Sequence, residues 1–142
     1  MTEDENKNLG WPQDLLGIAQ HRHQQTPQEI LRIEADDLGT KTNGLLQGRV
    51  DVGAQGQYIV LDFFIVAPSL DDYEYRLLKA RHKLLPQYPV EVILNSKDKR
   101  KATSPETLVV TLSDIFRAPS TLSVIGQLLD LIKNSGQTSS PQ

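Results

Sequence analysis

Four charged side chains are the residues of this sequence whose types and spacing could carry out chemistry. Three are carboxylates and the fourth is a guanidinium: Glu34, Asp51, Asp62 and Arg49. Carboxylates that converge from neighbouring elements can hold magnesium, and the bound metal can activate water and stabilise developing charge. The same residues can instead form a structural ion pair beneath a helix, with Arg49 neutralising Asp62 or Glu34. We favour the ion pair and keep all four as candidate catalytic residues.

Two of these carboxylates fall on a predicted β-hairpin. Residues 57–68 are almost all apolar and either β-branched or aromatic, which is typical of a strand covered on both faces. Residues 45–52 alternate between apolar and polar side chains, which predicts a partner strand. A turn at Gly53–Gly56 joins the two strands. The resulting register makes Arg49 a diagonal neighbour of Asp62.

Glu34 falls on a predicted helix that precedes the hairpin. Thr26, Pro27 and Glu29 have the spacing of a capping box with proline in the first turn. The helix is expected to run to about Gly39 and to be apolar along one side. At 100° per residue, Glu34 lies close to the middle of that side.

A second helix and a third strand are predicted after the hairpin. Residues 69–84 carry apolar side chains at helical spacing and begin with Ser-Leu-Asp-Asp, a typical helix start. Residues 88–95 then indicate a strand. A strand, a helix and a strand joined this closely predict a right-handed βαβ unit with parallel strands.

The C-terminal third is predicted to be helical. Residues 96–104 form an exposed basic loop, and Ser104-Pro105-Glu106 begins a helix. A competing strand at 108–112 explains neither this start nor the apolar Ile115 and Phe116. A last helix follows, ending at about Asn134.

The expected order of elements is α-β-β-α-β-α-α, which defines an α+β fold. Its sheet is small and mixed, with one antiparallel hairpin and one parallel crossover strand, and helices flank it. Residues 26–134 are expected to form a single domain. Residues 1–25 are expected to form a flexible N-terminal arm, and residues 135–142 a disordered tail.

An acid on a first helix and acids on two hairpin strands, followed by a parallel crossover, resemble the core order of restriction-endonuclease-like folds. The resemblance implies magnesium-dependent cleavage of nucleic acid, with a lysine two residues after a strand acid. Phe64 stands two residues after Asp62, and Gly53 two residues after Asp51, so the lysine is missing. A nuclease-like domain, active or degenerate, is therefore the alternative function.

Two further sets of residues could contact partners. The basic set could bind phosphates or an acidic protein, although a solvated loop is the simpler interpretation; it comprises Lys97, Lys99, Arg100 and Lys101. The apolar residues of the N-terminal arm could contact a protein partner or a second copy of the chain; they are Trp11, Leu15 and Leu16.

The composition narrows the classes of function. The 142 residues carry a net charge of −3 and include no cysteine, which excludes disulfides and thiolate catalysis. Neither the common nucleotide-binding motifs nor the serine-hydrolase motif occurs. No secretion signal and no membrane-spanning run is visible. We therefore expect a cytoplasmic, non-enzymatic interaction or regulatory protein, such as a small acidic partner or immunity-type inhibitor. We expect no metal and no cofactor, and a partner that is another protein or a second copy.

Overall fold

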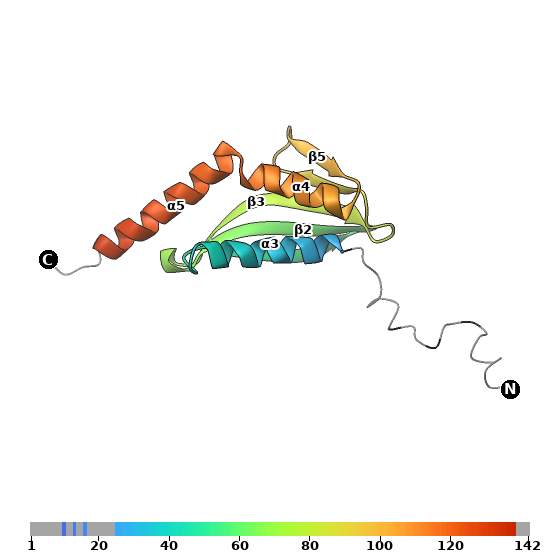
Figure 1. Ribbon diagram of the computed structural model, residues 1–142, viewed down its shortest axis with the longest axis horizontal. Helices are drawn as coiled ribbons and strands as arrows, with labels where there is room; N and C mark the ends of the chain where they lie inside the picture. The colour runs from blue at the N-terminus through green and yellow to red at the C-terminus, as the bar shows by residue number, and fades with distance from the viewer. Residues whose placement is uncertain (1–9, 11–12, 14–15, 17–24, 139–142) are drawn as a thin grey trace.

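The computed structural model describes residues 10, 13, 16 and 25–138 (Figure 1). Its elements, in chain order, are α3 (Pro27–Lys41), β1 (Gln47–Gln55), β2 (Tyr58–Ala67), the short 3-10 helix η1 (Pro68–Leu70), β3 (Tyr73–Lys83), β4 (Val90–Ile93), β5 (Lys99–Ala102), α4 (Pro105–Phe116) and α5 (Pro119–Thr138). The five described strands form one sheet in the order β1-β2-β3-β4-β5, and every neighbouring pair is antiparallel. The α+β class is as predicted, but the mixed sheet, the parallel crossover and the predicted order of elements are wrong.

Two helices cover one face of the sheet. Figure 1 shows α3 along the β1–β2 half and α4 toward β5, while α5 extends from the end of α4 toward η1 and the start of β3. The core lies between the sheet and these helices, and its largest fully buried side chains include Leu31, Leu61, Phe63, Ile65, Leu78, Val92, Leu108, Leu112 and Ile115. No described element covers the opposite face, which we call the open face.

β2 is covered by helices on one face only, which corrects the prediction of coverage on both faces. Its side chains alternate between fully buried and half-buried positions. On the open face, long arginine side chains of neighbouring strands shield the aromatic rings. The Arg49 guanidinium lies 4.6 Å from the centre of the Phe64 ring, and that of Arg81 lies 4.5 Å from the Tyr58 ring. An unusually apolar strand is thus compatible with a face that has no helix over it.

The helix starts follow their local sequence signals. The Thr26 hydroxyl accepts a hydrogen bond from the Glu29 backbone N–H at 3.1 Å, and the Glu29 carboxylate accepts one from the Thr26 N–H at 2.9 Å. The predicted capping box of α3 is therefore confirmed. Ser104 caps α4 in the predicted place, so the competing strand at 108–112 is excluded. The last helix is present and continues to Thr138, beyond the expected end at Asn134.

The β1–β2 hairpin has a different turn from the one predicted. Gln55 pairs with Tyr58 across a two-residue turn, and Gly56 has φ +64°. A turn at Gly53–Gly56 would have placed Gln47 opposite Asp62, whereas Asp51 occupies that position. The observed and predicted registers differ by an even number of residues, so each side chain still points to the predicted face.

β3 corrects the predicted helix over residues 69–84. Asp71 and Asp72 have φ angles of +61° and +55°, so they form a turn instead of a helix start. Leu78 pairs with Phe63 and Arg76 pairs with Phe64, which leaves Leu77 as an extra residue in a β-bulge. The bulge shifts the alternation of side chains by one residue along β3. Apolar positions on the two sides of the bulge therefore imitate helical spacing.

The predicted strand over residues 88–95 contains β4, but the strand is antiparallel to β3. The predicted basic loop over residues 96–104 contains β5, which pairs with β4 after a tight turn. Short turns of this kind connect antiparallel strands, and they leave no room for the helical crossover that a parallel pair would need.

Candidate functional site

The sheet separates the predicted catalytic residues. Asp51 and Asp62 are opposite each other on β1 and β2, and Arg49 lies beside them on the open face. Glu34 lies on α3, on the covered face, where it lines a cavity. The structure therefore brings together three of the four residues and leaves the acid on the helix on the other side of the sheet.

Arg49 is the centre of an ion-pair network on the open face. Its Nε lies 2.9 Å from Asp51 Oδ1, and its Nη1 lies 2.6 Å from Glu74 Oε2 on β3. The guanidinium donates hydrogen bonds to both carboxylates and so holds the pKa of Glu74 below its ordinary value. The same bonds raise the pKa of Arg49, with Glu74 making the largest contribution. Arg49 is thus neutralised by Asp51 and Glu74, and not by Asp62 or Glu34 as predicted.

Asp62 lies on β2 between a residue of like charge and two bases. Asp51 faces it across β1, and Lys79 faces it across β3. Asp62 Oδ1 lies 3.6 Å from Arg76 Nη1, which is an ion-pair distance but beyond a good hydrogen bond. The same oxygen is enclosed and has no hydrogen-bond partner among the described residues. Asp62 therefore relies on the nearby positive charges and not on direct hydrogen bonds.

The arrangement of acids does not form a metal site in the described part of the chain. No group of three or more His, Asp or Glu side chains there is placed to hold a metal ion. Asp51 is occupied by Arg49, and Glu34 is on the opposite face. On the open face the charged residues instead form ion pairs, with Arg49 contacting Asp51 and Glu74.

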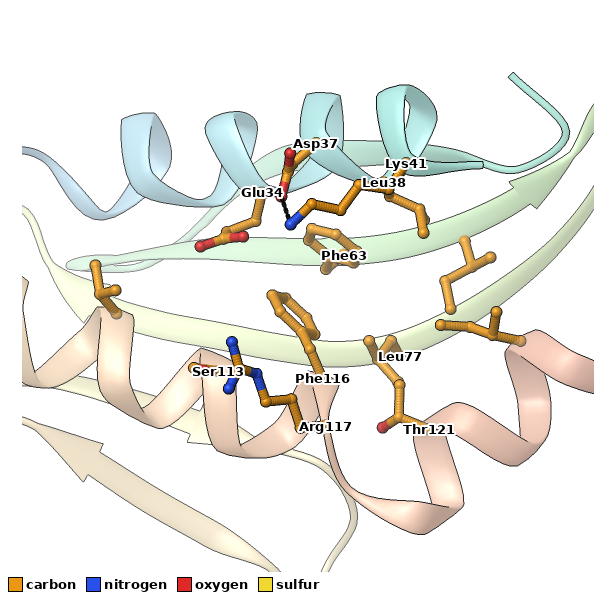
Figure 2. Close-up of a pocket in the computed structure, with 13 residues that line it drawn as sticks. Glu34, Asp37, Leu38, Lys41, Phe63, Leu77, Ser113, Phe116, Arg117 and Thr121 are labelled. Carbon is orange, nitrogen blue, oxygen red and sulfur yellow. Dashed lines mark ion pairs between the residues drawn. The ribbon is translucent and has the colours of Figure 1, made fainter. Parts of the chain in front are cut away.

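A cavity of about 450 Å³ lies between α3 and α4, over β2 and β3 (Figure 2). Its floor is apolar, and the rings of Phe63 and Phe116 approach each other there with centroids 5.4 Å apart. Figure 2 shows Glu34 reaching toward this space from α3 and Arg117 reaching toward it from the end of α4. Asp37 and Lys41 form an ion pair of 2.9 Å at the rim. The cavity thus combines an apolar floor with charges of both signs.

The electrostatics of the cavity are modest. Burial raises the pKa of the Glu34 carboxyl, and the negative charge of Asp37 adds to this effect. The hydrogen bond with Asp37 raises the pKa of Lys41. Ser113 supplies a hydroxyl, and no histidine lines the described walls.

The four basic residues of the predicted set lie on β5 and in the turn before it. Lys99 and Lys101 pair with Ile93 and Glu91 and extend over the open face. Arg100 points the other way and lies 3.4 Å from Asp98 Oδ1. Lys97 lies in the turn, where its backbone N–H donates to the Asn95 side chain at 2.8 Å. The strand therefore divides the four basic residues between two faces and a turn.

A groove between α5 and the start of β3 is the feature that sequence reasoning missed. We call it the α5 groove. It has a volume of about 700 Å³ and is lined by Leu70, Tyr73, Tyr75, Val124, Gln127, Leu128, Leu131, Asn134 and Ser135. The apolar spacing of α5 was visible in the sequence, but the direction of the helix relative to the sheet was not. In the structure α5 buries Leu128 and packs Val124 and Ile125 against the core, while Leu131 stays 54% exposed beside the groove.

Two of the three predicted contact residues of the N-terminal arm, Trp11 and Leu15, lie outside the described residues. Leu16 is described and is 88% exposed. The structure thus shows Leu16 as an accessible apolar side chain.

Comparison with protein-family models, with curated proteins and with solved structures finds no match for this chain. Within the described ranges, no single helix has the length and apolar character needed to cross a membrane. Only α4 and α5 taken together, bent by 57° at their junction, reach that length and composition. We therefore infer a function from the geometry of the sites.

Proposed function

We propose that this protein is a non-enzymatic protein-binding module and that the α5 groove holds an apolar segment of its partner. The observation that carries the proposal is an apolar groove whose two walls come from different elements and face accessible space. Tyr73 on one wall is 50% exposed, and Leu131 on the other wall is 54% exposed. Large apolar side chains that line one concave surface are typical of sites that bind other proteins.

The shape of the α5 groove favours an amphipathic helix or a short apolar strand as the bound segment. Amphipathic helices place their apolar side in grooves of this kind and are recognised through side chains at helical spacing. The two tyrosine rings supply rigid apolar area and a hydroxyl group each, a combination that is frequent at protein interfaces. Polar side chains at the rim, such as Gln127 and Asn134, can orient the bound segment through hydrogen bonds.

A binding role also agrees with the state of the charged residues. The acids that could have served as catalysts are held in ion pairs or lie on separate faces of the sheet. The alternative, a nuclease-like domain, stays a prediction. Magnesium-dependent cleavage of nucleic acid that is lost in Asp62→Asn would establish it.

The proposal is tested by photo-crosslinking from two positions on α5. Leu131 and Leu122 have nearly equal exposure, 54% and 53%, but only Leu131 lines the α5 groove. A photoreactive residue at each position is activated in an extract of the source cells, and the crosslinked peptides are identified by mass spectrometry. We expect position 131 to capture an apolar segment of a specific protein, and position 122 to capture none.

The captured protein is then purified and its affinity is measured. Leu131→Glu should weaken binding at least about tenfold, because burying an unpaired carboxylate in an apolar groove is unfavourable. Leu122→Glu is the matched control and should change the affinity by less than about twofold. Equal effects of the two substitutions would contradict the proposal.

A further inference from the structure

β1 forms one edge of the sheet, so one side of its backbone has no partner strand among the described residues. The strand spans Gln47–Gln55 and contains neither proline nor lysine. Both residue types commonly keep an edge strand from pairing with another chain. β1 is therefore an accessible template for another strand.

The hairpin turn determines which backbone groups of β1 face this free edge. Gln55 and Tyr58 close a two-residue turn with Gly56 at its first central position and at positive φ, as a type II′ turn requires. The closing pair of such a turn exchanges two hydrogen bonds, and hydrogen-bonded pairs then alternate along the ladder. Counting back from Gln55, the N–H and C=O groups of residues 48, 50, 52 and 54 point to the free edge.

We infer that β1 pairs with β1 of a second copy of this chain, antiparallel and centred on Val50. With Val50 opposite its own symmetry mate, Gly48 lies opposite Val52 of the second copy. The free backbone groups then meet as hydrogen-bonded pairs. Arg49 lies opposite Asp51 of the second copy, at a non-hydrogen-bonded position where side chains approach most closely. The two-fold axis creates this Arg–Asp pair twice.

Charge selects this register over its neighbours. A pairing centred on residue 49 would place two arginines directly opposite each other, and one centred on residue 51 would place two aspartates there. Like charges at opposite positions destabilise a strand pair. A pairing centred on Val50 surrounds each charge with opposite charge, because Arg49 already contacts Asp51 of its own strand at 2.9 Å. The edge of β1 is self-complementary in this register.

The packing of α3 also fits a pair of copies. A Cβ atom at Gly48 would lie 2.6 Å from the Ala35 Cβ atom, so α3 lies close over this end of β1. Val52, toward the other end on the same face, is 45% exposed. Antiparallel pairing brings the Gly48 end of each β1, which α3 covers, beside the exposed Val52 end of the other β1.

Charge reversal and mixing of full-length variants test the inference by sedimentation equilibrium. Wild-type protein should sediment with twice the chain mass of 15.9 kDa. Arg49→Asp alone and Asp51→Arg alone should each weaken self-association at least about tenfold, because each creates like-charge pairs in the dimer. An equal mixture of the two variants should form a heterodimer, since all cross-strand pairs in the mixture are opposite in charge. The double variant R49D/D51R should self-associate again.

Two further variants guard against a trivial loss of folding. Val52→Pro removes a backbone N–H that points to the free edge and not into the β1–β2 ladder, so the monomer should fold and the dimer should be lost. Lys41→Asp breaks an exposed ion pair away from the edge and should leave the dimer intact. A wild-type chain that sediments as one copy, or charge variants that fail to associate on mixing, would overturn the inference. The inference goes beyond the α5 groove and does not depend on it.

Discussion

The two edges of the sheet are built in opposite ways. β5 is four residues long and carries Lys99 and Lys101 on its open face. β1 is nine residues long, carries no lysine, and leaves Val52 45% exposed. Short strands and lysine side chains are the usual means by which natural sheets avoid pairing with other chains. The molecule therefore protects the β5 edge, whereas no described strand pairs with the edge of β1.

The comparison of the two edges extends to the rest of the surface, where accessible apolar and backbone groups lie only in certain places. Charged residues on the open face neutralise one another, as Arg49 does with Asp51 and Glu74. The α5 groove and the edge of β1, by comparison, have groups that no described residue covers. Such groups are unfavourable in an isolated chain in water. Their presence in two places supports the proposal that this protein binds other chains.

The largest expected effect concerns the end of β1 that lies under α3. In Gly48→Ala, the new methyl group would approach the Ala35 carbonyl oxygen to 2.8 Å, so α3 has to shift. We expect the free energy of unfolding to fall by about 3 kcal/mol, measured by urea denaturation. Gly53→Ala in the same strand is the matched control, because a Cβ atom there meets nothing within 4 Å. Equal stability of the two variants would contradict close packing of α3 on β1.

The next largest effect is expected from a substitution that makes the two edges of the sheet alike. Val52→Lys gives β1 the kind of residue that protects β5, and it should weaken self-association at least about tenfold. The reverse change, Lys101→Val, alters the short β5 edge and should leave the dimer unaffected. Both variants can be compared with wild type by sedimentation velocity over a series of protein concentrations. Loss of the dimer in Lys101→Val alone would place the interface at β5 and contradict pairing through β1.

A smaller effect concerns the N-terminal anchor of α3. Thr26→Ala removes the capping hydroxyl that accepts from the Glu29 N–H at 3.1 Å. The free energy of unfolding should fall by about 1 kcal/mol. Thermal denaturation should show this loss, while Thr40→Ala, near the exposed end of the same helix, should show a clearly smaller one. A cap variant as stable as wild type would mean that the box contributes nothing.

The smallest effect is the pH dependence that Glu34 contributes. Burial raises its pKa in the folded state above the ordinary value of 4.5, so the folded protein binds this proton more readily than the unfolded chain. As the pH falls through the raised pKa, wild type should gain stability relative to Glu34→Gln, and the gain should be complete below the ordinary value. Unfolding free energies of the two proteins, measured from neutral pH downward, test the sign. A difference that stays constant with pH would contradict burial of the Glu34 carboxyl.

Local signals in the sequence predicted the helices that depend on them. Thr26 and Ser104 each cap a helix in the predicted place, because capping requires only residues within one turn. The faces of β1 and β2 were also predictable, since alternation has a period of two residues. The register was not, because Gly53 and Gly56 could each have served in the turn and only Gly56 does.

The remaining differences have longer-range causes. The bulge at Leu77 disrupted the alternation in β3, so the strand resembled a helix and the predicted sheet became mixed. The expectation that helices cover both faces of β2 allowed Glu34 and Asp62 to converge, whereas they lie on opposite faces of the sheet. The α5 groove depends on the direction in which α5 leaves α4, and no local residue pattern specifies that angle. Sequence reasoning therefore found the charged residues but not their arrangement.

Hydrogen exchange at single backbone amides tests most directly whether β1 is an interface between copies. In wild-type protein, the amides of Gly48, Val50 and Val52 should exchange slowly although no described strand pairs with that side of β1. In Arg49→Asp the same amides should exchange fast, while the amides of β1 that bond to β2 stay protected. Fast exchange of the edge amides in concentrated wild-type protein would contradict the account.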